Sequence, residues 1–191
     1  LWTMGSNSYG KLGDGNGTAR TVPYQVVSSG VSDVATGSNH TVFVKTDGSL
    51  WGMGSNQYNT LGSNVANTGS KVPVKIYDSG IHRVFGSAAA SGIIKTDGSL
   101  WILGLGLNSA TALPSDSIGA KQIMASDVHT VAFGGTISGA YGGGHILIVK
   151  TDGSLWVMGN AWGGKLGTGN STSVETPTQL VANGVRAVAT G

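Results

Sequence analysis

The sequence predicts an all-β fold built from β-propeller blades, each a sheet of four antiparallel strands. Three observations predict it. The string Lys-Thr-Asp-Gly-Ser-Leu-Trp occurs three times, starting at Lys45, Lys95 and Lys150, and a fourth Leu-Trp pair opens the chain. These Leu-Trp pairs start at positions 1, 50, 100 and 155, and a period near 50 residues is typical of propeller blades. Stretches with the helical period of an amphipathic helix are missing.

Each repeat can be followed as four strands. Residues 41–46 predict a strand, Asp47-Gly48 predicts a hairpin turn of type I′, and residues 49–53 predict the next strand. A Gly-rich loop comes next. It leads to a strand with a proline, Pro23 in the first unit, whose missing N–H suits a strand start or a sheet edge. A Val-x-x-Val pattern beginning at Val31 predicts the fourth strand. Together the repeats form one predicted domain, with units at residues 1–49, 50–99, 100–154 and 155–191.

The third repeat is irregular, because its Gly-rich loop is short and extra residues follow it. We interpret residues around 125–141 as an inserted strand or excursion. In this interpretation His129 and Phe133 belong to a second copy of the His-Thr-Val-Phe strand. Insertions on a repeat scaffold map to loops, and loops carry binding residues. His129 and Phe133 are therefore candidate partner-binding residues.

The last repeat lacks the strand equivalent to residues 38–49, and the first repeat starts just after that strand. Unpaired strand edges at both ends would attract another chain. We therefore expect the chain to be part of a larger propeller or assembly, in one of two forms. Either further repeats complete the ring, or neighbouring copies share the broken blade in a closed oligomer or an open filament.

The composition excludes several classes of function. Charged residues make up 10% of the chain, the formal net charge is +2, and Lys and Arg form no basic run. Nucleic-acid binding needs a patch that neutralises several phosphates, so we expect no nucleic-acid partner. No apolar stretch approaches the length that spans a bilayer, so we expect no membrane insertion. The chain has no cysteine, which excludes disulfides, thiolate zinc sites and a cysteine nucleophile.

No catalytic, cofactor-binding or metal-binding motif stands out, so we expect no enzyme and no cofactor. His40 and His145 precede apolar strands, but Ala90 stands at the same position in the second repeat. We therefore expect these histidines to form hydrogen bonds between blades. Regular recurrence likewise predicts packing between blades for the repeated tryptophans, Trp2, Trp51, Trp101 and Trp156.

Aromatic residues in the Gly-rich loops are the remaining candidates for a binding site. Such residues could stack on sugars or anchor a protein partner. Local packing of the loop is the alternative. The candidates are Tyr9 beside Asn7, Tyr58 beside Asn56, and Trp162 in the fourth repeat.

The residues from Gly37 to Trp51 and from Leu1 to Gly15 together resemble the regulator-of-chromosome-condensation repeat family. The wording Lys-Thr-Asp-Gly-Ser-Leu-Trp is most similar to the bacterial and archaeal, α-tubulin-suppressor-like members. The resemblance implies a seven-bladed propeller of four-stranded blades. It also implies binding of other proteins, which is what most members do.

We therefore expect a non-catalytic protein-protein interaction or structural repeat module. Its expected place is the surface or the exterior of a prokaryotic cell, and its expected partner is another protein or copies of itself. The alternative is a glycan-binding module that uses the loop Tyr, Trp and Asn residues.

Overall fold

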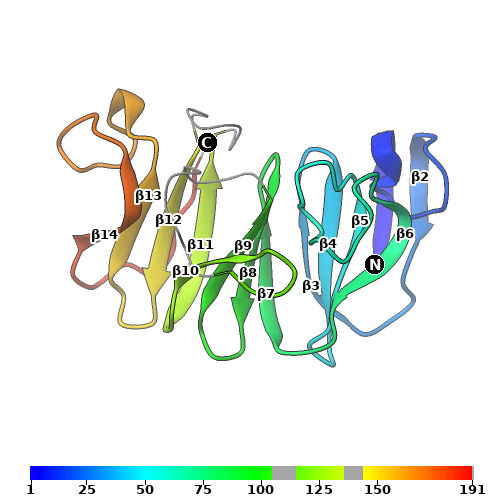
Figure 1. The fold of residues 1–191 in the computed structure, drawn as a ribbon, viewed down its shortest axis with the longest axis horizontal. Coiled ribbons are helices and arrows are strands. Elements are labelled where there is room, and N and C mark those ends of the chain that lie inside the picture. Colours follow the sequence, from blue (N-terminus) through cyan, green and yellow to red (C-terminus); the bar gives the residue numbers. More distant parts are fainter. Residues whose placement is uncertain (105–114, 136–143, 191) are drawn as a thin grey trace.

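The computed structural model describes residues 1–104, 115–135 and 144–190, and its strands form antiparallel sheets that stand side by side (Figure 1). Three sheets have four strands and one has two, so the predicted blades are confirmed. The two-stranded sheet pairs β1 (Trp2–Gly5) with β2 (Arg20–Gln25). Within the described ranges the only helical turns are two 3-10 segments, η1 (Ser8–Gly10) and η2 (Trp162–Gly164).

The three complete blades follow one another along the chain, each with its strands in sequence order. The first blade contains β3 (Val31–Thr36), β4 (His40–Lys45), β5 (Leu50–Gly54) and β6 (Ser70–Tyr77). The second contains β7 (Ile81–Gly86), β8 (Ala90–Lys95), β9 (Leu100–Gly104) and β10 (Lys121–Met124). The third contains β11 (Val128–Gly134), β12 (His145–Lys150), β13 (Leu155–Gly159) and β14 (Val174–Val181).

Each blade straddles two sequence repeats, because its first two strands precede a Leu-Trp pair and its third strand begins with that pair. The first strands of successive blades, β3, β7 and β11, contact one another and so form the inner wall. The last strands are sheet edges, and β6 and β14 carry Pro73 and Pro177 there, where a missing N–H is tolerated.

The Asp-Gly hairpins have a different turn from the predicted type I′. Only the glycines have positive φ, which is 78° at Gly48, Gly98 and Gly153. Gly48 N donates to Lys45 O at 2.9 Å, and Lys45 N donates to Ser49 O at 2.9 Å. This is a three-residue hairpin loop that closes on a left-handed glycine. The prediction of type I′ was wrong because the Asp47 carboxylate accepts hydrogen bonds from Ser49, and Asp47 itself keeps an ordinary backbone conformation.

The core lies between the blades. One buried cluster joins the first two complete blades, with Val42, Leu61 and Ile93 among its members and Trp101 packed against it. A second joins the second and third blades, with Ile102 and Ile146 as members and Trp156 packed against it. Packing of the repeated tryptophans between blades is thus confirmed at these two positions. Trp2, in contrast, is 60% exposed.

The third repeat contains no inserted strand at residues 128–133, which corrects the interpretation above. β11 is the first strand of the third blade, equivalent to β3 and β7, and it pairs with β12. Asp127 precedes it with φ 65°, at the place where Gly30 and Gly80 precede the other first strands. Thr151 N donates to the carbonyl of Asp127, just as its counterpart Thr46 N donates to the carbonyl of Gly30. The extra residues therefore fall between β11 and β12, mostly in 136–143, outside the described residues.

In the described ranges, no helix is both long and apolar enough to cross a membrane.

Candidate functional site

The loops that follow β1, β5 and β13 lie at one edge of the molecule, which we call the upper edge (Figure 1). The Asp-Gly hairpins lie at the opposite, lower edge. Three upper-edge loops are described, at residues 6–19, 55–69 and 160–173. Each presents one large aromatic side chain to solvent: Tyr9 is 55% exposed, Tyr58 45% and Trp162 80%. The upper edge therefore displays the three predicted loop aromatics, which come from the two-stranded sheet and from the first and third complete blades.

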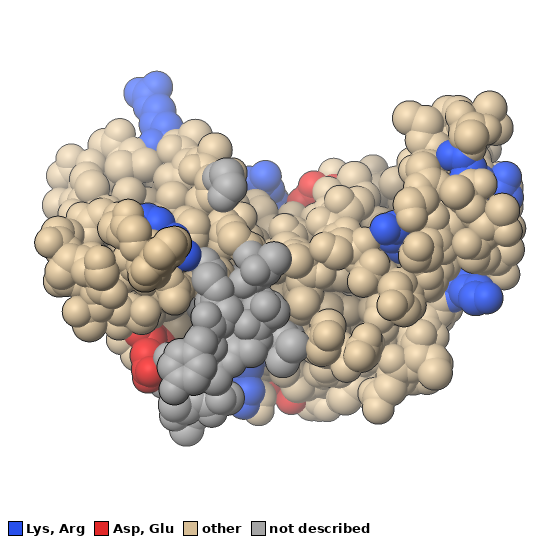
Figure 2. All heavy atoms as spheres, turned by 90° about the horizontal axis from the view of Figure 1, so that it is seen from above, with Lys and Arg blue, Asp and Glu red and all other residues tan. Residues whose placement is uncertain are grey.

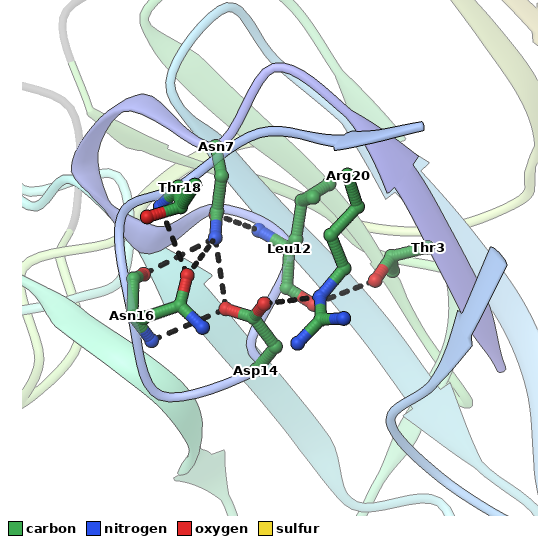
Figure 3. A network of polar contacts seen from close by, with 7 residues as sticks. All are labelled: Thr3, Asn7, Leu12, Asp14, Asn16, Thr18 and Arg20. Atoms are coloured by element: carbon green, nitrogen blue, oxygen red, sulfur yellow. Dashed lines mark hydrogen bonds and ion pairs between the residues drawn. The ribbon is translucent and has the colours of Figure 1, made fainter. Parts of the chain in front are cut away.

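The buried amide of Asn7 organises the first loop (Figure 3). Its Oδ1 accepts from Leu12 N at 2.9 Å. Its Nδ2 donates to Asp14 Oδ1 at 2.8 Å and to Asn16 O at 3.2 Å. Asn16 Oδ1 in turn accepts from Thr18 N at 2.9 Å. The amide of Asn7 is thus fully used inside the loop, and it fixes the backbone that carries Tyr9.

Asp14 is the charged centre of the same network. Arg20 Nε donates to its Oδ2, and Asn16 N donates to its Oδ1 at 3.1 Å. Burial alone would raise the pKa of Asp14, but the Arg20 guanidinium and the hydrogen bonds from Asn16 and Asn7 outweigh it, so the pKa lies below the usual value. A carboxylate that stays ionised and paired holds the end of the loop to the start of β2.

Asn56 does in the second loop what Asn7 does in the first. Its side chain is completely buried. Nδ2 donates to Gly62 O at 2.9 Å and to Val65 O at 2.8 Å, and Oδ1 accepts from Leu61 N at 2.8 Å. In the fourth repeat Ala161 stands at this position, and Asn160 Oδ1 instead accepts from Trp162 N at 2.9 Å. Each loop is thereby held by local side-chain hydrogen bonds.

The backbone at Tyr9 is unusual. Its φ is 65°, a region that costs a non-glycine residue of this size free energy. Gly163 occupies the equivalent place in the fourth repeat with φ 74°. The turn at Tyr9 is closed by Gly10 N donating to Asn7 O at 2.9 Å. Surrounding contacts therefore over-determine this conformation, and such strained positions cluster at functional sites.

The other predicted partner-binding residues lie away from these loops. His129 is exposed near the start of β11, at the lower edge. Phe133 is half-buried, packs against the core cluster between the second and third blades, and lines an open hollow of about 500 Å³ on the inner wall. The structure therefore brings Tyr9, Tyr58 and Trp162 to one edge, with Asn7 and Asn56 beneath two of them, and leaves His129 and Phe133 apart.

Sequence reasoning missed two hollows at the lower edge. The larger, of about 860 Å³, lies between the Asp47-Gly48 hairpin and the start of β7, and it includes His82 and Arg83. The second lies at the equivalent place beside Asp152-Gly153 and Arg186. The recurrence of the Asp-Gly hairpin, here in the first and third complete blades, was the signal that could have located them.

His40 is buried and confirms the expected hydrogen bond between blades, although the partner atom is a side chain: its Nε2 lies 2.9 Å from Ser91 Oγ in β8. Burial lowers the pKa of His40 to about 4, so the ring is neutral near pH 7. In the part of the chain that the structure describes, no group of three or more His, Asp or Glu side chains is arranged to hold a metal ion.

Comparison with known proteins identifies the repeats. Residues 1–44 and residues 31–60 match two family models, both described as the regulator of chromosome condensation (RCC1) repeat. The crystal structure of human WBSCR16 is similar with 21% identity and a TM-score of 0.80, over 100% of this chain and 50% of that chain. Yeast RCC1 (Prp20), in a crystal structure bound to Kap60, is similar with 20% identity and a TM-score of 0.69, over 91% of this chain and 43% of that chain.

A further structure of Prp20p from Saccharomyces cerevisiae has 21% identity and a TM-score of 0.66, over 95% of this chain and 46% of that chain. The chain thus spans about half the length of the solved structures that it matches. At these identities the likeness shows the fold, which is that of RCC1-type propellers.

Proposed function

Because the chain carries regulator of chromosome condensation repeats folded as propeller blades, we propose that it is a non-catalytic protein-interaction module that binds its partner at the upper edge. This repeat fold commonly mediates protein interaction. The solved relative from yeast is bound to Kap60 in one structure, and the description of another names binding to Gsp1p and histones. Those partners belong to that protein.

The observation that carries the proposal is the presentation of Tyr9, Tyr58 and Trp162 on loops held by internal hydrogen bonds. Exposed aromatic residues on a rigid support lose little conformational entropy on binding, and Tyr and Trp dominate the binding energy of protein interfaces. Local packing does not account for Trp162, because four-fifths of its surface faces solvent.

The experiment replaces Trp162 with a photo-crosslinking phenylalanine analogue in the native cells and identifies the captured protein. The matched control places the same analogue at Val181, an exposed residue at the end of β14 away from the upper edge. We expect one protein to be captured from position 162 and not from 181, and Tyr9→Asn to reduce its yield. Equal capture from both positions would contradict binding of the partner at the upper edge.

Glycan binding is the second candidate function, and Trp162 is the feature that favours it, since exposed aromatic rings stack on sugars. The amides of Asn7 and Asn56 offer no support, because both are buried and bonded inside their loops. A glycan array separates the two candidates. Binding to a glycan that is lost in Trp162→Ala would favour the glycan-binding module. If no glycan on the array binds, the protein-interaction module is favoured.

We also propose that the outer face of the third blade docks a further blade, from a longer chain or from a second copy. His145 is 7% exposed and its Nδ1 has no hydrogen-bond partner in the described chain, whereas the equivalent His40 is bonded to the neighbouring blade. The same blade carries a buried apolar cluster of Val157, Ala161 and Leu166. Light scattering across concentration tests this. Self-association weakened by His145→Ala is expected for copies, and a monomer at every concentration would contradict self-assembly.

We place the protein at the surface or the exterior of a prokaryotic cell. The proposal is supported by composition: charge is scarce, and Gly is abundant at 33 residues. Fractionation of the native cells is the test, and recovery only with the cytosolic fraction would overturn this placement.

A further inference from the structure

We infer that the upper edge takes an acidic protein segment, whose carboxylates pair with Lys11 and Lys71 while an apolar side chain packs on Tyr9 and Val72. This inference rests on the proposed function, because it names the chemistry of the partner at the same edge. We call these four residues the Tyr9 patch.

The net charge of the chain is concentrated at the upper edge. All charged residues lie in the described segments. Four cations lie at the upper edge, Lys11, Arg20, Lys71 and Lys165, against two anions, Asp14 and Glu175. The remaining seven cations and seven anions balance, so this edge carries the whole formal charge of +2. Figure 2 views this edge from above, and Lys and Arg predominate over Asp and Glu on it.

The cations at the upper edge also differ from those elsewhere in how they are paired with carboxylates. Away from the upper edge, several cations lie within ion-pair distance of a carboxylate: Lys75–Asp78 at 3.2 Å, Lys95–Asp116 at 3.5 Å and Lys150–Asp127 at 3.9 Å. At the upper edge Arg20 forms an ion pair with Asp14, which compensates the charge of that carboxylate. Lys11 Nζ donates to Ser38 O at 2.7 Å, and neither Lys11 nor Lys71 has a carboxylate at ion-pair distance among the described residues.

The Tyr9 patch crosses the boundary between the two-stranded sheet and the first complete blade. A Cβ added to Gly10 would lie 2.5 Å from Lys71 Cγ, so Lys71 packs against the residue next to Tyr9. A Cβ added to Gly15 would lie 3.9 Å from Val72 Cγ1. Gly15 N also donates to Lys71 O at 2.9 Å. These contacts place Lys71 and Val72 of β6 against the loop that carries Tyr9 and Lys11.

The exposed part of the patch is both apolar and cationic. Tyr9 is 55% exposed, Val72 is 50% exposed, and Lys71 is exposed as well. An apolar centre with a polar rim is the usual anatomy of a protein interface. Complementary charge on the partner steers its approach and excludes competitors of like charge.

A protein segment fits this surface better than a nucleic acid does. Nucleic-acid binding depends on neutralising several phosphates along a groove, and single-stranded binders stack successive bases on aromatic rings. The Tyr9 patch offers two lysines and one aromatic ring. Its aliphatic Val72 suits an apolar side chain of a peptide.

The test measures fluorescence anisotropy with three labelled probes: a short Glu-rich peptide with a central Leu-Phe pair, the same peptide with Gln for Glu, and an oligothymidine. We expect the acidic peptide to bind most tightly, and its affinity to fall as salt rises, because exposed charges are screened. Lys71→Gln should weaken binding about three- to tenfold, and Lys11→Gln should act similarly. Lys75→Gln is the matched control, since Lys75 is equally charged but paired with Asp78 away from this edge, and it should leave the affinity unchanged.

Three outcomes would overturn the inference: equal affinity for the acidic and the Gln peptides, equal losses in Lys71→Gln and Lys75→Gln, or tighter binding of the oligothymidine. Failure of the proposed function is distinguishable. If photo-crosslinking at position 162 captures a protein and Lys11→Gln with Lys71→Gln does not weaken that capture, the protein-interaction function stands and the acidic class of partner is wrong.

Discussion

His40 in β4 and Ser91 in β8 share a buried hydrogen bond of 2.9 Å that joins the first two complete blades. Ser91 Oγ also donates to Thr60 O at 2.9 Å, in the upper-edge loop of the first blade. Thr41 Oγ1 makes the same contact one blade earlier, to Lys11 O at 2.9 Å. A hydroxyl near the start of β4 and of β8 thus ties the loop of the preceding sheet in place, and at these two junctions the packing of the blades supports the upper edge.

His40 makes stability depend on pH. Burial lowers its pKa to about 4, although a hydrogen bond to the Ala90 backbone opposes the change, whereas an unfolded histidine has a pKa near 6.5. Between these values the unfolded chain binds a proton that the folded chain does not. Stability is therefore fully present above about pH 6.5 and is lost as pH falls toward 4, by about 3 kcal/mol at most. Urea unfolding at pH 7 and near pH 4.5 measures this loss.

The control for that experiment is His40→Ala, because Ala90 occupies the equivalent position in the second blade. The variant is less stable at pH 7 but loses less on acidification. Identical losses in the two proteins would show that other groups account for the pH dependence.

Asn56→Ala should destabilise the protein by about 2 kcal/mol, because Gly62 O, Val65 O and Leu61 N lose their buried partners. Asn67→Ala, at an exposed residue of the same loop, should cost less than about 0.5 kcal/mol. Thermal melting of both variants is the measurement. Similar melting temperatures would mean that the amide of Asn56 does not hold the loop.

Gly48→Val should cost about 2 kcal/mol more than Thr46→Val. Gly48 has φ 78°, which a β-branched residue adopts only with strain, and a Cβ there would lie 3.3 Å from Gly80 N of the next blade. Thr46, in the same hairpin, has no positive φ. Chemical denaturation of the two variants measures the difference. Equal denaturation midpoints would contradict the left-handed backbone conformation of Gly48.

Asp127→Gly tests the assignment of β11. Asp127 has φ 65°, so glycine should be neutral or stabilise by up to about 1 kcal/mol, whereas Asp127→Val should destabilise. Ser126→Gly, next to it and without positive φ, is the control and should not stabilise. If Asp127→Gly unfolds the protein more easily than Ser126→Gly does, the turn before β11 is wrongly described.

The repeated hairpins could be predicted from the sequence because Lys-Thr-Asp-Gly-Ser-Leu-Trp fixes strand, turn and strand within seven residues. The first strand of the third blade could not be predicted in the same way. In the other blades a glycine marks the turn before this strand, but here Asp127 takes its place. Gly119, earlier in the chain, was mistaken for that glycine. Aspartate tolerates the left-handed conformation through its own side-chain hydrogen bonds, so the turn persists without its usual marker.

The candidate site was predicted in part. Exposed aromatics can be expected in Gly-rich loops, and Tyr9, Tyr58 and Trp162 are exposed. The burial of Asn7 and Asn56 could not be foreseen, because side-chain direction in a loop follows no period and depends on which backbone groups need partners. The patch formed by Tyr9 with Lys71 joins residues from different sheets, which only the packing of the sheets reveals.

Hydrogen–deuterium exchange of the protein, alone and with the protein captured at position 162, tests the central claim most directly. Binding at the upper edge predicts slower exchange in peptides covering residues 6–19, 55–69 and 160–173. The same account predicts unchanged exchange in the lower-edge hairpins at 46–49, 96–99 and 151–154. Protection of those hairpins with no change in the three loops would contradict it.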